Sequence, residues 1–297
     1  MVSRSSIISR FKMQFLANTT TTILGALLSV LLARLLNPDG YGLLFLALSF
    51  FAVAKIFSKA GIGASSARYI SEYKETNPEQ VPNIIKIGFK YVLILSVTFS
   101  LIILLGSDLF SALIAEPGLA PFLTLGALFV FSKTMEHFAK KVLQAHEDIN
   151  SAAKVSIVSS VLRFVLASGL VVAGLGALGA LLGYVASAFV AAIVGLTLVY
   201  VKYLRRTSLT EKVADELKRR IGEYAVPLTA TNSATAINSH FDTLLIGYFL
   251  NPVAVSYYVV SKQAVKFIQT PASALGFTLA PTFSAEKASD TDSDPGR

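Results

Sequence analysis

Long uninterrupted apolar runs dominate the pattern of hydrophobic and polar positions along this chain. A helix needs roughly 20 mostly apolar residues to cross the hydrocarbon core of a bilayer. Closed β-barrels can also span a bilayer, but their strands alternate apolar and polar residues. The pattern therefore predicts an all-α integral membrane protein of about eight transmembrane helices, at about 13–35, 42–66, 85–106, 119–138, 152–173, 177–203, 223–248 and 254–282.

Composition agrees with this prediction and removes several classes of function. Hydrophobic residues make up 54% of the chain and charged residues 15%, against about a quarter charged in soluble domains. Cysteine is absent, which excludes disulfides and thiol nucleophiles. No phosphate-binding loop, zinc-protease helix or nucleophile-elbow motif occurs, and the three histidines are widely separated. We therefore expect no enzyme, no catalytic residue, no metal site and no cofactor.

Basic residues predict the orientation of the spans. The loops at 107–118, 174–176 and 249–253 contain no Lys or Arg, whereas basic residues flank the first span and the loops after spans two, four and six. By the positive-inside rule, both termini lie on the cytoplasmic side of the cell membrane. The net charge of +8 is divided among these loops rather than gathered on one face, which argues against nucleic-acid binding.

The tripeptide Leu-Asn-Pro occurs twice, at 36–38 and 250–252, and each copy ends one apolar run shortly before the next. This internal repeat predicts that the first hairpin of one lobe recurs at the start of a second. We accordingly divide the chain into an N-terminal six-helix lobe, a cytoplasmic amphipathic linker, the first hairpin of a second lobe and a disordered acidic tail, at 1–206, 207–222, 223–283 and 284–297.

Two segments of the second half carry further expectations. In the linker, Val213, Leu217 and Ile221 recur at helical spacing, which fits a helix on the lipid surface and a solvated linker equally well. Pro227 and Pro271 lie inside spans seven and eight. Both of these spans should bend, because proline removes a helical hydrogen bond.

Lysines at membrane depth are the strongest candidates for binding. Lys55 and Lys59 lie in span two, and Lys262 and Lys266 in span eight. Each pair has i,i+4 spacing, which places both ammonium groups on one helical face. A charge at the bilayer centre costs about 2.5–3.5 kcal/mol, so these faces should line a wet cavity that binds an anion such as a phosphate or diphosphate. The alternative is that the lysines extend towards lipid headgroups, which suits Lys59 best.

Other ionisable residues of the predicted spans have less definite roles. Lys133, Glu136 and His137 make span four the least apolar. In span seven, His240 and Asp242 lie close together, and Asp242 could pair with a span-eight lysine or bind a coupling cation. Arg163 in span five could line the same cavity or face the cytoplasm.

Four segments, at 34–50, 67–73, 143–164 and 248–263, carry a resemblance to a known family. They read RLLNPDGYGLLFLALSF, ARYISEY, LQAHEDINSAAKVSIVSSVLRF and YFLNPVAVSYYVVSKQ. With them the chain resembles the polysaccharide-biosynthesis flippases of the multidrug/oligosaccharidyl-lipid/polysaccharide exporter superfamily. The resemblance implies two six-helix lobes around a central cavity and alternating access. It also implies cavity cations for a polyisoprenoid phosphate- or diphosphate-linked sugar, at the positions of Lys55, Lys59, Lys262 and Lys266.

The resemblance leaves the detailed role open. The sugar would serve cell-surface polysaccharide or protein N-glycosylation, on undecaprenyl carriers in bacteria or dolichyl carriers in archaea. Partners would be the glycosyltransferases of the same pathway and the lipid bilayer. Relatives usually have more spans, so a homodimer or companion subunit is expected to complete the cavity. The alternatives are a cation-coupled multidrug antiporter of the same superfamily and a non-transporting membrane scaffold for glycan assembly.

Overall fold

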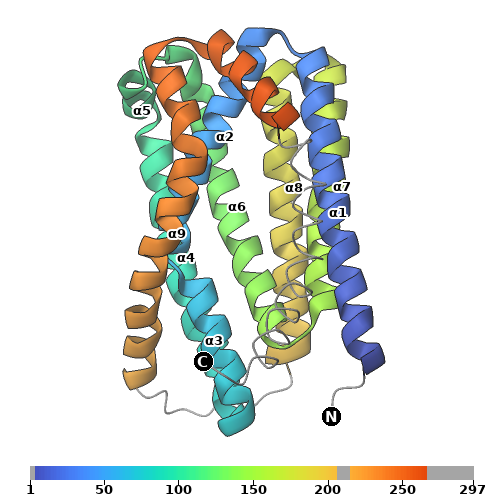
Figure 1. Ribbon diagram of the computed structural model, residues 1–297. Coiled ribbons are helices and arrows are strands. Elements are labelled where there is room, and N and C mark those ends of the chain that lie inside the picture. The colour runs from blue at the N-terminus through green and yellow to red at the C-terminus, as the bar shows by residue number, and fades with distance from the viewer. Residues whose placement is uncertain (1–3, 206–214, 266–297) are drawn as a thin grey trace, which may run out of the picture.

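The computed structural model describes residues 4–205 and 215–265, and all regular structure within these ranges is helical. The long helices run up and down in one bundle (Figure 1). The α-helices are α1 (Arg4–Leu35), α2 (Pro38–Lys59), α3 (Ile62–Thr76), α4 (Val81–Leu105), α5 (Ser107–Leu113), α6 (Ala120–Ala145), α7 (Ile149–Leu170), α8 (Gly176–Val199) and α9 (Asp215–Phe249). Residues 252–265 form a further helix after α9.

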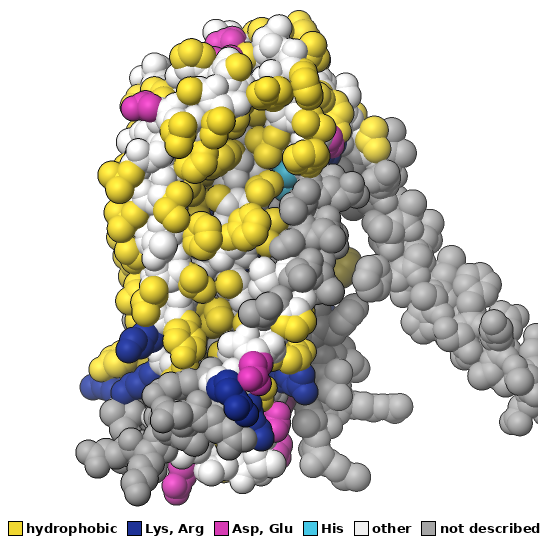
Figure 2. Space-filling model, turned by 90° about the vertical axis from the view of Figure 1, so that its left-hand side faces the viewer, with side chains coloured by type: hydrophobic (Ala, Val, Ile, Leu, Met, Phe, Trp, Pro, Cys, Tyr) yellow, Lys and Arg dark blue, Asp and Glu magenta, His cyan; other side chains and the backbone are white. Residues whose placement is uncertain are grey.

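The membrane character of the bundle is confirmed. The stretches long and apolar enough to cross a membrane are Lys12–Leu35, Pro38–Lys59, Pro78–Leu105, Pro117–Ala145 and Ile149–Leu204. The last of them contains both α7 and α8, so each of the first six predicted spans corresponds to a helix. Hydrophobic side chains cover most of the face in Figure 2, while Lys and Arg gather at its lower end. An all-α fold with an apolar belt is what a bilayer requires.

The second span ends earlier than we expected, at Lys59 rather than residue 66. Ala60 and Gly61 have φ angles of 39° and 65°, which residues other than glycine rarely adopt. A Cβ on Gly61 would also lie 2.6 Å from the carbonyl oxygen of Ala225. The helix therefore breaks here, and the chain continues as α3.

The fourth span is longer than expected, because α6 continues past residue 138 to Ala145. Its polar residues satisfy one another inside the bundle. Lys133 lies 2.6 Å and Lys140 lies 3.3 Å from Glu136 in two ion pairs. Phe138 and Val142 are fully or almost fully buried beyond them, so apolar packing sustains the last turns.

The described part of the predicted linker does not form a separate surface helix. Residues 215–222 are the first turns of α9. Leu217 and Ile221 are 4% and 0% exposed, and the Ser65 hydroxyl of α3 donates a hydrogen bond to the Ile221 carbonyl at 2.8 Å. The apolar face that predicted a lipid or linker position packs against α3 instead.

Several expectations concern residues outside the described ranges. They are Lys266, Pro271, the remainder of the linker at 206–214 and the acidic tail at 284–297. Pro227 lies inside α9, which continues on both sides of it.

The two copies of Leu-Asn-Pro have the same local structure. Asn37 accepts a hydrogen bond on its side-chain oxygen from the Gly40 amide at 2.9 Å, and Asn251 accepts one from the Ala254 amide at 2.9 Å. In each copy asparagine is the N-cap of the next helix and proline follows it, an arrangement that both residue types favour. The repeated sequence is therefore a repeated hairpin turn.

The two turns also touch. A Cβ on Gly42 in α2 would lie 1.7 Å from the Pro252 carbonyl oxygen, so only glycine permits this contact. Close by, between α9 and α2, a Cβ on Gly247 would lie 2.4 Å from Leu46. The first hairpin and the described part of the second therefore pack together at the upper end in Figure 1, which we call the Asn37 end.

Candidate functional site

A cavity of about 570 Å³ lies between α2, α3, α6 and α9. Its lining residues are Ala52, Lys55, Ile56, Lys59, Gly61, Gly63, Ala64, His137, Lys141, Leu228, Thr229 and His240. Lys55 and Lys59, which we predicted as a cationic pair, thus face one cavity together. His240 of the predicted seventh span joins them from α9.

The cavity receives a second i,i+4 pair from α6, formed by His137 and Lys141. Residues four apart lie on the same helical face, so each of two packed helices presents two nitrogen-bearing side chains. The sequence analysis noted His137 without assigning it a role and did not select Lys141. The spacing of these two residues is the signal that could have found them.

The charge of the cavity lining is positive. It contains three lysines and two histidines, and among its described lining residues there is no Asp or Glu. The neighbouring carboxylate, Glu136, is already paired with Lys133 and Lys140 and accepts a hydrogen bond from Ser159 at 3.3 Å. Glu136 is only 3% exposed, so its charge compensates buried lysines behind the cavity wall.

Lys55 is the deepest of the lysines along α2, since Lys59 ends that helix. Its ammonium lies 5.2 Å from the centroid of the Phe129 ring. It experiences repulsion from Lys59, Lys133 and Arg163 and attraction to Glu136. A cation with one carboxylate and several cations around it favours an added anion.

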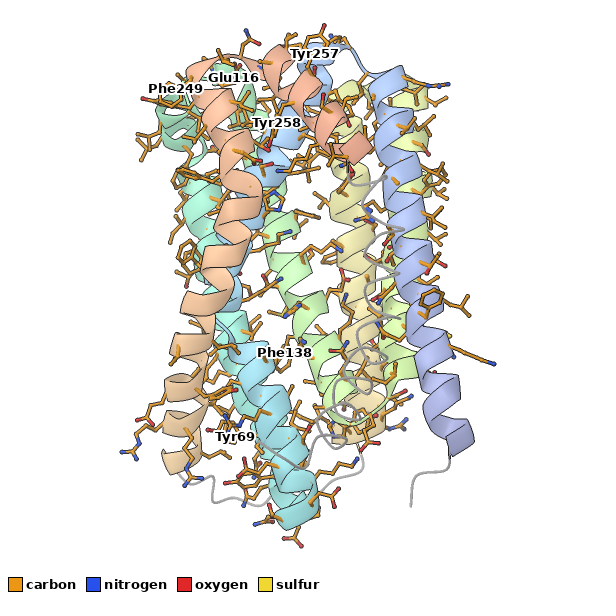
Figure 3. The ribbon with its side chains drawn as sticks, viewed as in Figure 1. Tyr69, Glu116, Phe138, Phe249, Tyr257 and Tyr258 are labelled. Atoms are coloured by element: carbon orange, nitrogen blue, oxygen red, sulfur yellow. The ribbon has the colours of Figure 1, made fainter. Side chains whose placement is uncertain are left out.

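Lys262, the predicted span-eight lysine that the structure describes, is not among the residues that line this cavity. Lys262 forms an ion pair with Asp242 at 2.6 Å, and the Tyr258 hydroxyl donates a hydrogen bond to the same carboxylate. Tyr258 lies at the Asn37 end of the bundle, opposite the end that carries Tyr69 (Figure 3). Of the two roles that we considered for Asp242, the geometry matches the ion pair with a span-eight lysine.

Arg163 takes neither of the two positions that we considered for it. It lines another cavity, of about 350 Å³, whose lining residues come from α1, α2, α7, α8 and the helix at 252–265. The guanidinium carbon lies 5.5 Å from the centroid of the Tyr184 ring. The Lys55 and Arg163 cavities thus have different lining residues.

Comparison with known proteins identifies relatives of this fold. A family described as polysaccharide biosynthesis protein matches residues 11–286. No curated protein matches the chain. An inward-facing multidrug resistance MATE family transporter of the MOP superfamily superposes with a TM-score of 0.69 and 17% identity, over 84% of this chain and 59% of that one.

Two further solved structures are similar. A MOP superfamily transporter from Pyrococcus furiosus, described as having a binding pocket of reverse polarity, gives a TM-score of 0.53 and 19% identity over 86% of this chain and 62% of that one. The eukaryotic MATE transporter AtDTX14 gives 0.55 and 19% over 82% and 58%. This chain thus spans less than two thirds of the length of all three structures, and these identities establish a shared fold.

Proposed function

Because the chain belongs to the polysaccharide biosynthesis protein family, we propose that it is a flippase, or a component of one, for polyisoprenoid phosphate- or diphosphate-linked sugars. The coarser conclusion is that this is a multi-pass membrane protein of that family, with a fold shared with MATE transporters of the MOP superfamily. The proposal adds the class of substrate and its transport across the membrane.

The cationic cavity around Lys55 is the observation that carries the proposal. Phosphate and diphosphate groups bind through charge-assisted hydrogen bonds, and lysine supplies three donors on a point charge. A cavity for a cationic drug would instead need carboxylates, and the described lining has none. Its volume of about 570 Å³ falls in the range of small-ligand sites, roughly 300–1,000 Å³.

The distribution of basic residues supports an orientation for transport. Lys59 and Lys141 lie towards the end of the bundle that carries α3, and Lys and Arg side chains gather at this lower end (Figure 2). By the positive-inside rule this end faces the cytoplasm. The cavity would then receive a lipid-linked sugar from glycosyltransferases on the cytoplasmic side of the cell membrane.

The carrier and the assembly belong to the same proposal. The carrier would be undecaprenyl or dolichyl phosphate, serving cell-surface polysaccharide or protein N-glycosylation. A second copy of the chain or a companion subunit would supply further cavity wall. The described residues enclose the Lys55 cavity from α2, α3, α6 and α9, which is enough for the phosphate contacts that the proposal requires.

Binding of a lipid diphosphate tests the proposal. The full chain in lipid nanodiscs would be titrated with a short polyprenyl diphosphate and with the matching polyprenyl alcohol. We expect the diphosphate to bind more tightly, and Lys55→Gln with Lys59→Gln to weaken it at least about tenfold, since hydrogen bonds to charged groups contribute about 1.5–3 kcal/mol.

The matched control is the exposed lysine pair Lys86 and Lys90 on α4, which has the same i,i+4 spacing outside the cavity. Replacing both with Gln should leave diphosphate affinity unchanged. Equal binding of diphosphate and alcohol, or equal losses in both double variants, would rule out the cavity as the phosphate site.

A cation-coupled multidrug antiporter is the second candidate. It is favoured by the group formed by Asp242, Lys262 and Tyr258, because a carboxylate that exchanges partners is a means of coupling to a cation. If the protein is an antiporter, substitution of Asp242 should reduce transport more than substitution of any cavity lysine. A third reading, a scaffold for glycan assembly, requires the segment at 210–222 and no cavity lysine. The flippase, the antiporter and the scaffold therefore differ in which substitutions abolish function.

A further inference from the structure

The smaller cavity, around Arg163, has a lining that differs in chemistry from the Lys55 cavity. Its polar lining residues are Thr21, Thr22, Ser29, Arg163, Tyr184 and Gln263. Hydroxyl and amide groups thus outnumber charges, and an aromatic ring forms part of one wall. This combination suits a polyol with one negative charge better than a compact phosphate.

The guanidinium of Arg163 has unused hydrogen-bonding capacity. Its Nε is buried and has no hydrogen-bond partner among the described residues. The guanidinium carbon lies over the Tyr184 ring, which is a cation–π contact and not a hydrogen bond from its N–H donors. A buried donor without a partner is unfavourable, so a ligand that accepts from this group is expected.

The neighbouring groups limit what that ligand is. The Thr21 hydroxyl donates to the Asn18 carbonyl at 2.9 Å, and its oxygen is left to accept. The Ser29 hydroxyl shares a hydrogen bond of 2.8 Å with Tyr41. On the other side, a Cβ on Gly25 would lie 3.8 Å from a terminal nitrogen of Arg163, which is an ordinary van der Waals distance, so α1 approaches the guanidinium here without a side chain. Hydroxyl-rich, single-anion ligands fit these partners.

A row of side chains connects the two cavities. The Lys55 ammonium lies 5.2 Å from the Phe129 ring centroid, and that ring lies 6.3 Å from the Tyr184 ring. Tyr184 in turn contacts Arg163 at 5.5 Å. These side chains fill the space between the cavities, since Phe129 is only 4% exposed, so a ligand that reaches both cavities would have to pass over them.

We propose that the Arg163 cavity binds the carboxylate of an acidic sugar, while the Lys55 cavity holds the diphosphate of the same lipid-linked substrate. The inference rests on the proposed flippase function and adds to it a substrate class, a uronic or similar acidic sugar. The planar fork of arginine matches a carboxylate in a bidentate pair, and the Tyr184 ring faces the apolar side of the sugar.

Two synthetic probes test the proposal on the full chain in nanodiscs. Both are short polyprenyl diphosphates, one with glucose and one with glucuronic acid, which differ at the carboxylate. We expect the glucuronic acid probe to bind roughly 10- to 100-fold more tightly, since a bidentate charged pair contributes at this level. Arg163→Gln should remove this preference, so that the two probes bind with equal affinity.

Further variants separate the carboxylate contact from a folding defect. Gly25→Leu keeps the charge of Arg163 but covers its guanidinium, and should remove the preference as well. Arg34→Gln, at an exposed position on α1, should keep it. Retained affinity for the glucose probe shows that a variant is folded.

Two results would overturn the carboxylate proposal. One is equal affinity of wild-type protein for the two probes. The other is an equal loss for both probes in Arg163→Gln, which would place the diphosphate on this arginine. Failure of the proposed function is a different result, in which Lys55→Gln with Lys59→Gln affects neither probe.

Discussion

Among single residues, the Asp148 side chain joins the start of α7 to the segment that follows α8. It is the N-cap of α7 and accepts from the Ser151 amide at 3.1 Å. It also forms an ion pair with Lys202, beyond the end of α8, at 2.5 Å. Burial alone would raise the pKa of Asp148, but the hydrogen bonds from Lys202 and Ser151 outweigh it and hold the pKa below its usual value.

A lowered pKa in the folded state makes stability depend on pH in a defined direction. The contribution of Asp148 is complete above its unfolded pKa of about 3.9 and is lost as pH falls through the folded value. Asp148→Asn, which keeps an N-cap, should therefore lower the free energy of unfolding at pH 7 by about 1 kcal/mol. The expected change is modest because Lys202 is 41% exposed, and solvent screens the ion pair.

Thermal unfolding in detergent measures this effect. The melting temperatures of wild type and Asp148→Asn should differ at pH 7 and converge as pH falls below about 4. Asp148→Ala also removes the N-cap and should remain less stable at both pH values. A difference between wild type and Asp148→Asn that persists unchanged at acid pH would show that the carboxylate charge is not the source.

At the scale of elements, the two Leu-Asn-Pro turns carry the relation between the two halves of the chain. Both asparagines cap the following helix with the same hydrogen bond at 2.9 Å. The turns then meet where Gly42 lies against Pro252. Local capping thus fixes the start of each second helix, and glycine allows the two hairpins to approach closely.

Removing one cap should cost stability in proportion to that single hydrogen bond. Asn37→Ala should lower the free energy of unfolding by about 1 kcal/mol, within the usual range for N-caps, and Asn37→Asp should retain most of it. Denaturant or thermal unfolding would compare the two variants. Equal stability of Asn37→Ala and wild type would mean that the turn is held by the packing of Gly42 rather than by the cap.

Helices were more predictable from the sequence than their ends. A span needs a continuous apolar stretch, which is a property of the local sequence, and α1, α2, α4, α6, α7 and α8 all follow from this requirement. The end of α2 depends on Gly61 meeting the Ala225 carbonyl. Gly61 is itself a local signal for a helix end, but its contact with a helix far along the chain is not visible in the local pattern.

The same limit applies to residues 215–222. Helical spacing of Leu217 and Ile221 correctly predicted an amphipathic helix, but period alone does not say what the apolar face contacts. The structure packs it against α3 through Ser65. A lipid surface and a protein surface require the same spacing, so only the tertiary arrangement separates them.

At the scale of the whole molecule, the functional account depends on which helices come together. The i,i+4 rule found Lys55 and Lys59, since both lie on α2. It could not find that His137, Lys141 and His240 share their cavity, because these come from α6 and α9. Nor could it place Lys262, whose partner Asp242 lies on another helix. Charges group across helices only after folding.

The resulting molecule has two kinds of charged group at membrane depth. Cations without carboxylates line the Lys55 cavity, while the charges near the Asn37 end are paired as Asp242 and Lys262. A cavity lined by lysines with no Asp or Glu among its described lining residues suits a phosphate-bearing substrate, and a paired carboxylate suits coupling or structure. Substitution at each set therefore separates the flippase from the antiporter.

Translocation of a fluorescent polyprenyl diphosphate-linked sugar in proteoliposomes tests most directly whether this chain is a flippase that uses the Lys55 cavity. The readout is the rate at which the probe becomes accessible to an external quencher. We expect wild-type protein to accelerate this rate, and Lys55→Gln with Lys59→Gln to abolish most of the acceleration. Lys86→Gln with Lys90→Gln should preserve it. Two results would contradict the proposed flippase function. One is no acceleration by wild-type protein, and the other is a loss caused by Asp242→Asn but not by the Lys55 and Lys59 changes.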